Sequence, residues 1–90
     1  MLEKLINGTL QEEDYETLIG NNTYDSKITE FNSKHTTVTV ETVINYSGRF
    51  FLIDWTDGGR VKENTYHSVC EVNKVEVLGI KWEPIENGRP

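Results

Sequence analysis

His67 and Cys70 are the residues of this 90-residue chain whose types and spacing most resemble a reactive site. The spacing is half that of a zinc or redox motif, but Cys70 is the only cysteine and His35 the only other histidine, so a tetrahedral zinc site cannot be completed. A nucleophilic pair would need the thiol and the imidazole in contact and a third group to orient the imidazole. Three positions apart, they could meet on a helix but would point to opposite faces of a strand. We therefore interpret Cys70 as a structural residue.

Two of the three carboxylates Asp54, Asp57 and Glu63 could form a pair for acid–base chemistry. Asp57, however, directly precedes Gly58-Gly59, and aspartate at this position is typical of a tight turn. The glycines also lack the spacing and the following helix of a phosphate-binding loop. We therefore expect no enzymatic activity, no metal and no cofactor.

The charge of the chain is unevenly distributed. Residues 1–30 contain seven carboxylates and two lysines, which gives −5 of the net charge of −6. The basic residues of the remainder are scattered singly among acids, so no basic patch for nucleic acid is expected. A basic partner protein, by contrast, would be attracted over a long range. The carboxylates that we assign to this acidic surface are Glu12, Glu13, Asp14, Glu16, Asp25 and Glu30.

Length and composition indicate one small domain over residues 1–90. A single cysteine suits a reducing compartment. The first residues lack the basic start and apolar run of a signal peptide, and no stretch approaches the ~20 apolar residues of a membrane span. We therefore expect a cytoplasmic protein with no membrane partner.

The first 20 residues have helical periodicity. Residues 2–6 fit a short helix that Asn7-Gly8 would end, because both residues tolerate a left-handed C-cap conformation. Thr9 and Glu12 have the form of a capping box, which predicts a second helix from Thr9 to a stop at Gly20. Its outward face would carry three glutamates opposite its apolar residues.

The middle of the chain changes from a polar segment to a period of two. Residues 21–35 fit either a loop with a turn of helix, which we favour, or a short helix with Tyr24, Ile28 and Phe31 on its inner face. Alternation over 36–46 predicts a half-buried strand, and Ser47-Gly48 predicts a hairpin turn. The next strand, residues 49–55, is apolar on both sides and is expected to be covered on both faces.

The last third of the sequence is less regular. Residues 57–59 predict a turn, and residues 60–62 could begin a third strand. Residues 66–72 fit either a strand or a helical turn, whereas 75–82 predict the last strand.

These elements define an α+β fold with one or two short N-terminal helices followed by a three- to four-stranded antiparallel β meander. Within the single domain, residues 1–35 form the acidic helical segment, 36–83 the meander and 84–90 a flexible tail.

Large apolar residues raise two further expectations. Two small helices could leave one sheet face uncovered, and Phe50, Leu52 and Trp55 are then candidates for a homodimer or partner face. Alternatively, Trp55, Tyr66 and Trp82 could form the platform of a small SH3-like or barrel-like module that binds a peptide or a modified side chain.

In size, acidity and layout, the chain resembles the small acidic proteins that phages use to disable host factors, including DNA mimics. Glu12, Glu13, Asp14 and Glu16 carry this resemblance, together with the overall charge. Glutamates four apart on a helix lie ~6 Å from each other, close to the phosphate spacing of a nucleic acid. The resemblance implies a non-enzymatic inhibitor or adaptor in the host cytoplasm that binds a basic protein, such as a nucleoid or other DNA-binding protein. A homodimer would double the acidic surface.

Overall fold

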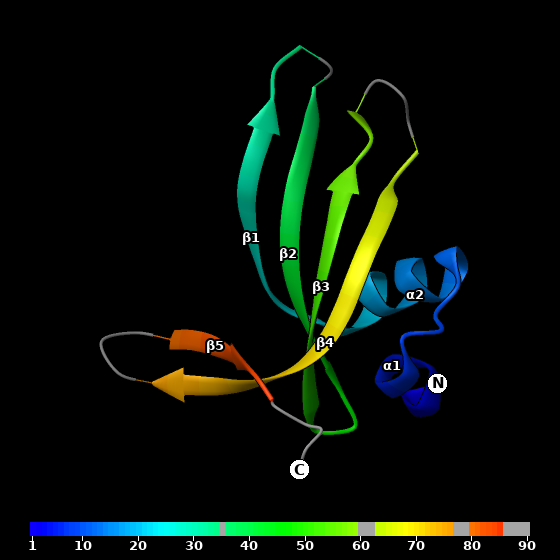
Figure 1. Cartoon of the computed structure of the whole chain (residues 1–90), viewed down its shortest axis with the longest axis vertical. Coiled ribbons are helices and arrows are strands. Elements are labelled where there is room, and N and C mark those ends of the chain that lie inside the picture. The colour runs from blue at the N-terminus through cyan, green and yellow to red at the C-terminus, as the bar shows by residue number, and fades with distance from the viewer. Residues whose placement is uncertain (35, 60–62, 77–79, 86–90) are drawn as a thin grey trace.

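The computed structural model describes residues 1–34, 36–59, 63–76 and 80–85. Two short helices precede five strands, and the strands form one antiparallel sheet in chain order (Figure 1). The elements are α1 (Leu2–Asn7), α2 (Glu12–Asn22), β1 (Thr23–Asn32), β2 (Thr37–Tyr46), β3 (Arg49–Asp57), β4 (Thr65–Glu76) and β5 (Ile80–Pro84). The expected α+β class is therefore confirmed.

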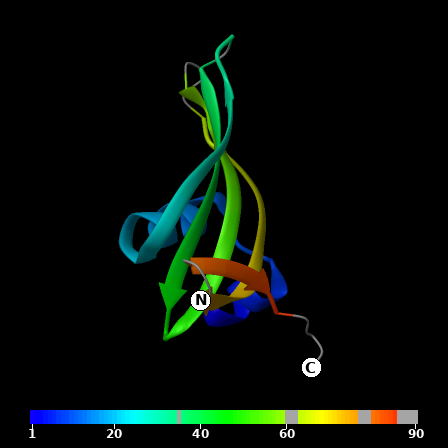
Figure 2. The same ribbon diagram turned by 90° about the vertical axis from the view of Figure 1, so that its left-hand side faces the viewer.

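The sheet is strongly curled. β4 is long enough for its first part to pair with β3 and for its last five residues, Val72–Glu76, to pair with β5. Figure 1 shows that the end of β4 turns away from the other strands and that β5 runs across their base. Turned by 90°, the ribbon shows the twist that accompanies this bend (Figure 2). The sheet is consequently a half-barrel, and β1 and β5 are its outermost strands in the described part of the chain.

The expected strand number was too low, because residues 21–35 were interpreted as a loop. All ten residues of β1 are exposed, so the strand has no buried face to produce an alternating pattern. Pairing with β2 instead satisfies the backbone groups on the side that faces β2 and defines the segment as a strand.

The prediction of one last strand over 75–82 was also wrong. Val75 and Glu76 end β4, and Ile80 begins β5, so the apolar run contains the ends of two paired strands. An apolar run alone does not reveal a reversal of direction. The predicted start of a strand at 60–62 lies outside the described residues, as do positions 86–90 of the predicted tail.

The ends of the helices follow local hydrogen bonds. Gly8 ends α1 in the left-handed conformation with φ of 70°, as predicted. The capping box, however, is formed by Gln11 and Asp14 rather than by Thr9 and Glu12, because α2 begins only at Glu12. Gly20 does not end the helix either: it has ordinary negative φ, and α2 continues to Asn22.

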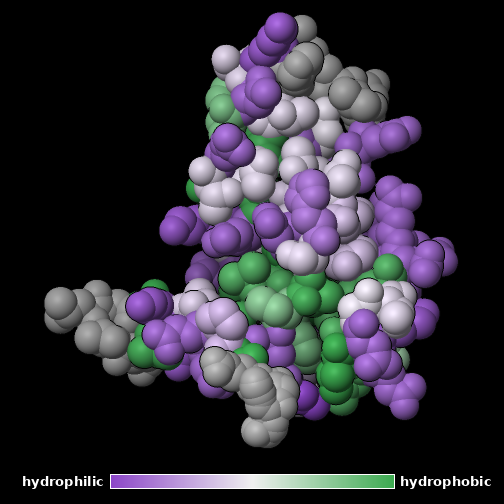
Figure 3. Space-filling view, viewed as in Figure 1, coloured by the Kyte–Doolittle hydropathy of each residue, from purple (hydrophilic) through white to green (hydrophobic). Residues whose placement is uncertain are grey.

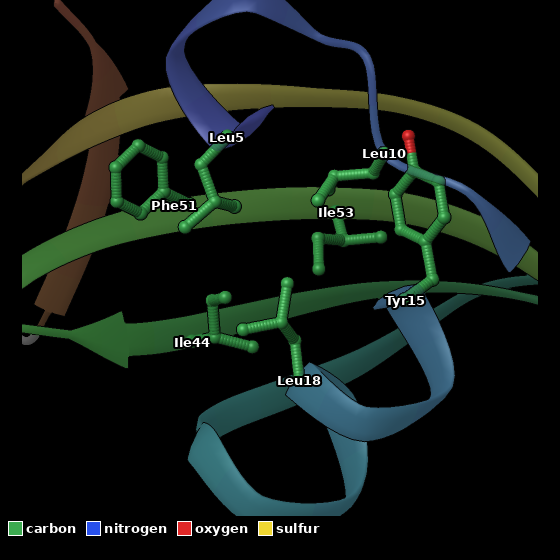
Figure 4. Packing of buried hydrophobic residues seen from close by; sticks show 7 residues of the cluster. All are labelled: Leu5, Leu10, Tyr15, Leu18, Ile44, Phe51 and Ile53. Atoms are coloured by element: carbon green, nitrogen blue, oxygen red, sulfur yellow. The ribbon is translucent and has the colours of Figure 1, made fainter. Parts of the chain in front are cut away.

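The main core lies between the helices and one face of the sheet. Figure 4 shows the helical side chains meeting those of β2 and β3. The cluster consists of Leu5, Leu10, Tyr15, Leu18, Ile44, Phe51 and Ile53. Because Ile44, Phe51 and Ile53 are fully buried, the predicted strands 36–46 and 49–55 do turn an apolar face inward.

The two predicted turns next to β3 are present. Ser47 and Gly48 both have positive φ, 54° and 78°, as a tight hairpin requires. At the other end, the Asp57 carboxylate accepts a hydrogen bond from the Gly59 N–H at 3.0 Å. Stabilisation of this turn therefore explains why an aspartate occupies position 57.

Candidate functional site

The helical layer, residues 1–22, contains most of the negative charge. It has five carboxylates and one lysine, which is −4 of the net −6. Lys4 lies 3.3 Å from Asp14, so the only base of the layer is already paired. The layer thus presents one sign of charge on the outside of the main core.

Asp14 belongs to the structure of this layer. Its carboxylate accepts a hydrogen bond from the Gln11 N–H at 3.0 Å and one from the Lys4 ammonium. The Gln11 hydrogen bond, followed by the Lys4 contacts, lowers the pKa of Asp14 below its usual range. Its role as a helix cap and as a link between α1 and α2 makes it a poor candidate for contact with a partner.

Three glutamates remain on the exposed surface of α2, and we call Glu12, Glu13 and Glu16 the acidic face. The helix contains no lysine, arginine or histidine. Within the described part of the chain, none of the three glutamates has an ion pair. Figure 3 shows hydrophilic side chains over α2, at the right of the view. These carboxylates are therefore free to meet a cationic surface.

Asp25 and Glu30, the other two predicted acidic residues, lie on β1 rather than on the helical layer. The Asp25 carboxylate accepts hydrogen bonds from the Trp82 indole N–H at 3.2 Å and from the Ser26 N–H at 2.9 Å. Glu30 lies further along the strand, opposite Thr39 of β2. The six predicted carboxylates consequently do not form one surface.

Phe50, Leu52 and Trp55, the predicted dimer or partner face, are divided between the two faces of the sheet. Phe50 and Leu52 lie on the face away from α2, whereas Trp55 shares the face of Phe51, against the main core. The reason is the strand period of two, since Trp55 is an odd number of positions from Leu52.

The face away from α2 is partly covered by the curl of the sheet itself. Tyr24, Phe50 and Trp82 pack edge to face or tilted, with ring centroids 5.0–5.7 Å apart, and we call this group the aromatic clasp. Lys74 adds a hydrogen bond of 3.1 Å to the Tyr24 hydroxyl. The clasp holds β5 over the start of β1. Sequence reasoning missed it because Tyr24 was assigned to a loop.

A cleft of about 280 Å³ lies beside the aromatic clasp. Val43 and Leu52 contribute apolar surface from the middle of the sheet, and Trp82 contributes the edge of the clasp. Charges of both signs surround them. The lining residues are Asp25, Ser26, Lys27, Glu41, Val43, Leu52, Ile80, Lys81 and Trp82.

Trp55 and Tyr66 are part of an aromatic column under α2. Tyr15 stacks on Tyr66 at 4.8 Å, and Tyr66 stacks on Trp55 at 5.8 Å. The Trp55 indole N–H donates to the buried Thr42 hydroxyl at 2.9 Å. Because Trp82 lies in the clasp on the other face, the three predicted platform aromatics do not form a common platform.

His67 and Cys70 both lie on β4. His67 Nε2 lies 2.8 Å from the Thr56 hydroxyl. Cys70 is exposed as a residue, but partial burial of its thiol and then the charge of Glu41 raise its pKa, which disfavours the reactive thiolate. In the described residues, no group of three or more histidine, cysteine, aspartate or glutamate side chains could hold a metal ion.

No family model, no curated protein and no solved structure matches the chain.

Neither helix in the described part of the chain has the length and apolarity needed to cross a membrane.

Proposed function

We propose that the protein is a non-enzymatic inhibitor or adaptor that binds a basic protein through its acidic face. The main support is that Glu12, Glu13 and Glu16 are exposed on a helix without any basic residue and have no ion-pair partner in the described structure. This surface is smaller than the sequence suggested, because Asp14 caps α2 and Asp25 binds Trp82.

The chemistry of the acidic face fits a protein that normally binds nucleic acid. Glu12 and Glu16 are four positions apart on one side of α2, which places their Cβ atoms ~6 Å from each other. A rigid row of such charges can occupy a groove built for phosphates. Association would be fast, because opposite charges attract before contact. It would weaken as salt is added, because salt screens this attraction beyond about 8 Å at physiological ionic strength. We propose the cytoplasm of a phage-infected host as the place of action.

Capture from a bacterial lysate tests this function. The immobilised protein should retain a basic DNA-binding protein at 50 mM salt and release it at 500 mM. Glu12→Gln/Glu13→Gln/Glu16→Gln should lose it. A matched variant on the sheet side, Glu41→Gln/Glu63→Gln/Glu83→Gln, removes the same amount of charge and should retain it.

Either of two results would contradict the proposal. The first is that the variant with the three helical glutamates replaced still captures the partner. The second is that both triple variants lose the partner equally, which would show that only net charge matters. Competition provides a further check. Duplex DNA should displace the protein from its captured partner if both occupy one basic groove.

The cleft beside Trp82 supports a second candidate, a module that takes an apolar side chain of a partner peptide. It combines apolar lining from Val43 and Leu52 with an aromatic wall and mixed charges, as ligand clefts commonly do. A peptide selected from a random library on the intact protein should lose binding to Trp82→Ala and to Leu52→Lys. Trp55→Phe, on the other face, should leave binding unchanged.

A further inference from the structure

The outer edge of β1 is an open strand edge with apolar side chains. All ten residues of β1 are exposed, including Ile28 at 65% and Phe31 at 60%. In the structure as described, β2 is the only strand that pairs with β1. Figure 1 shows no element beyond the upper part of β1. Such an edge is a template for the addition of another strand.

An irregularity at Thr29 determines which side chains of β1 share a face. Ile28 lies opposite Val40 and Phe31 opposite Val38, and these two β2 residues are two positions apart. Ile28 and Phe31 therefore point to the same face. In a regular strand, residues three apart would point to opposite faces. The extra residue, Thr29, removes this alternation.

The same irregularity brings Lys27 and Glu30 together on the other face. Lys27 lies opposite Glu41 and Glu30 opposite Thr39, again two positions apart on β2. The central part of β1 thus has an apolar pair on one face and a pair of opposite charges on the other. Both pairs are centred near Thr29.

We infer that β1 pairs antiparallel with β1 of a second copy of this chain, about a two-fold axis near Thr29. Such an axis perpendicular to the sheet keeps each face with the same face of the partner. If Lys27 lies directly opposite Glu30 of the second copy, then Ile28 lies diagonal to Phe31. If Ile28 lies opposite Phe31, then Lys27 is diagonal to Glu30. Opposite and diagonal neighbours are ~5 Å and ~7–8 Å apart, within reach of these side chains.

The charges of the strand favour a second copy over a foreign strand. A lysine on an edge strand normally discourages an added strand, because an apolar residue of that strand would leave the ammonium group without an opposite charge. In the symmetric pair each Lys27 meets a Glu30, so two opposite-charge contacts form. Beyond the start of β1, which the aromatic clasp covers, no strand of the described structure pairs with its outer edge, whereas Phe50 packs within the clasp. The inference is independent of the acidic face, and its primary readout is molecular mass.

Sedimentation equilibrium of the full chain tests the inference, with circular dichroism to verify that each variant is folded. The wild type should show a concentration-dependent monomer–dimer equilibrium. Ile28→Lys/Phe31→Lys should be monomeric. Ile80→Lys, an exposed apolar residue of β5 at the opposite edge, should dimerise like the wild type.

Charge reversal gives the sharper test. Lys27→Glu and Glu30→Lys should each weaken dimerisation about tenfold, because two attractive contacts become repulsive. An equimolar mixture of the two variants should recover wild-type association, since one copy then has two acids and the other two bases at these positions. Contacts within one chain cannot produce this recovery. Lys34→Glu, in the turn after β1, changes the net charge equally and should have little effect.

A monomeric wild type at concentrations up to 1 mM would overturn the inference. So would a dimer that persists in Ile28→Lys/Phe31→Lys, because it would use another surface. Failure of the mixed charge variants to associate more tightly than either alone would also overturn it.

Discussion

The contribution of the Trp55–Thr42 hydrogen bond to stability tests whether Trp55 has a structural role. Thr42 is 1% exposed, and its hydroxyl accepts from the Trp55 indole N–H at 2.9 Å and lies 3.2 Å from the Ser26 hydroxyl. Thr42→Val keeps the shape of the side chain but removes both hydrogen bonds, so the Trp55 indole N–H and the Ser26 hydroxyl lose a partner. An unsatisfied buried polar group costs about 1–3 kcal/mol. Because Trp55 is only half-buried, we expect the free energy of unfolding to fall by about 1–2 kcal/mol.

A double-mutant cycle isolates this bond from the loss of ring area. Trp55→Phe should also destabilise the protein, since it removes both the donor and part of the indole. The double variant should lose less than the sum of the single losses, with a coupling of about 1 kcal/mol. The free energies are measured by urea unfolding, followed by far-ultraviolet circular dichroism at pH 7.

Thr39→Val provides the matched control on the same strand. Its hydroxyl makes only a long contact of 3.4 Å with Thr56, so we expect a loss of no more than about 0.5 kcal/mol. If Thr42→Val is equally mild, or if the cycle is additive within about 0.3 kcal/mol, the reasoning is wrong. Packing against Tyr66 and the main core, rather than this hydrogen bond, would then hold Trp55 in place.

Four further predictions concern local interactions. The bidentate hydrogen bonds from Arg49 lower the pKa of Glu71. The stability that they add at neutral pH should therefore disappear as the pH falls through that lowered pKa. In urea titrations from pH 7 to pH 3, the difference in unfolding free energy between the wild type and Glu71→Gln should shrink. Leu18→Ala should cost about 2–5 kcal/mol, the usual range for a buried leucine, because Leu18 is 1% exposed; urea unfolding measures it. Gly48→Ala should cost about 1–2 kcal/mol, because alanine is strained at a φ of 78°. No atom obstructs a Cβ there, so this backbone strain is the whole expected cost; thermal unfolding measures it. Alkylation of Cys70 by iodoacetamide at pH 7.5 should be slower than that of a free thiol, because its pKa is raised; mass spectrometry measures the rate.

Each of these four predictions has a result that would contradict it. A constant difference between the wild type and Glu71→Gln across the pH range would mean that the ion pair does not perturb Glu71. A cost below about 1 kcal/mol for Leu18→Ala would place Leu18 outside the rigid core. A neutral Gly48→Ala would contradict the left-handed turn. Alkylation of Cys70 at the rate of a free thiol would contradict its raised pKa.

The strands and turns that were predicted correctly have strong local signals. The alternation over 36–46 and the apolar run over 49–55 each correspond to a strand with buried residues, because burial of one face selects apolar side chains there. The Ser47-Gly48 and Asp57–Gly59 turns follow from residues that tolerate positive φ or bond their own backbone.

β1 and the β4–β5 hairpin were not predictable in this way. β1 has no buried face, so nothing in its pattern distinguishes it from a polar loop. The end of β4 and the start of β5 read as one apolar strand, since reversal of the chain there does not interrupt the apolar pattern. In both cases pairing with another strand supplies the information that the local sequence lacks.

The sequence alone determined the excess of acid in the N-terminal segment and the outward direction of Glu12, Glu13 and Glu16. Both follow from composition and helical geometry, which are local properties. Only the tertiary structure decided which acids remain available to a partner. Asp14 is engaged by a lysine of the other helix, and Asp25 by Trp82, 57 positions away. The faces of β1 were also set by an irregular pairing with β2. Contacts between segments far apart in the sequence depend on the tertiary fold, and no local sequence pattern encodes them.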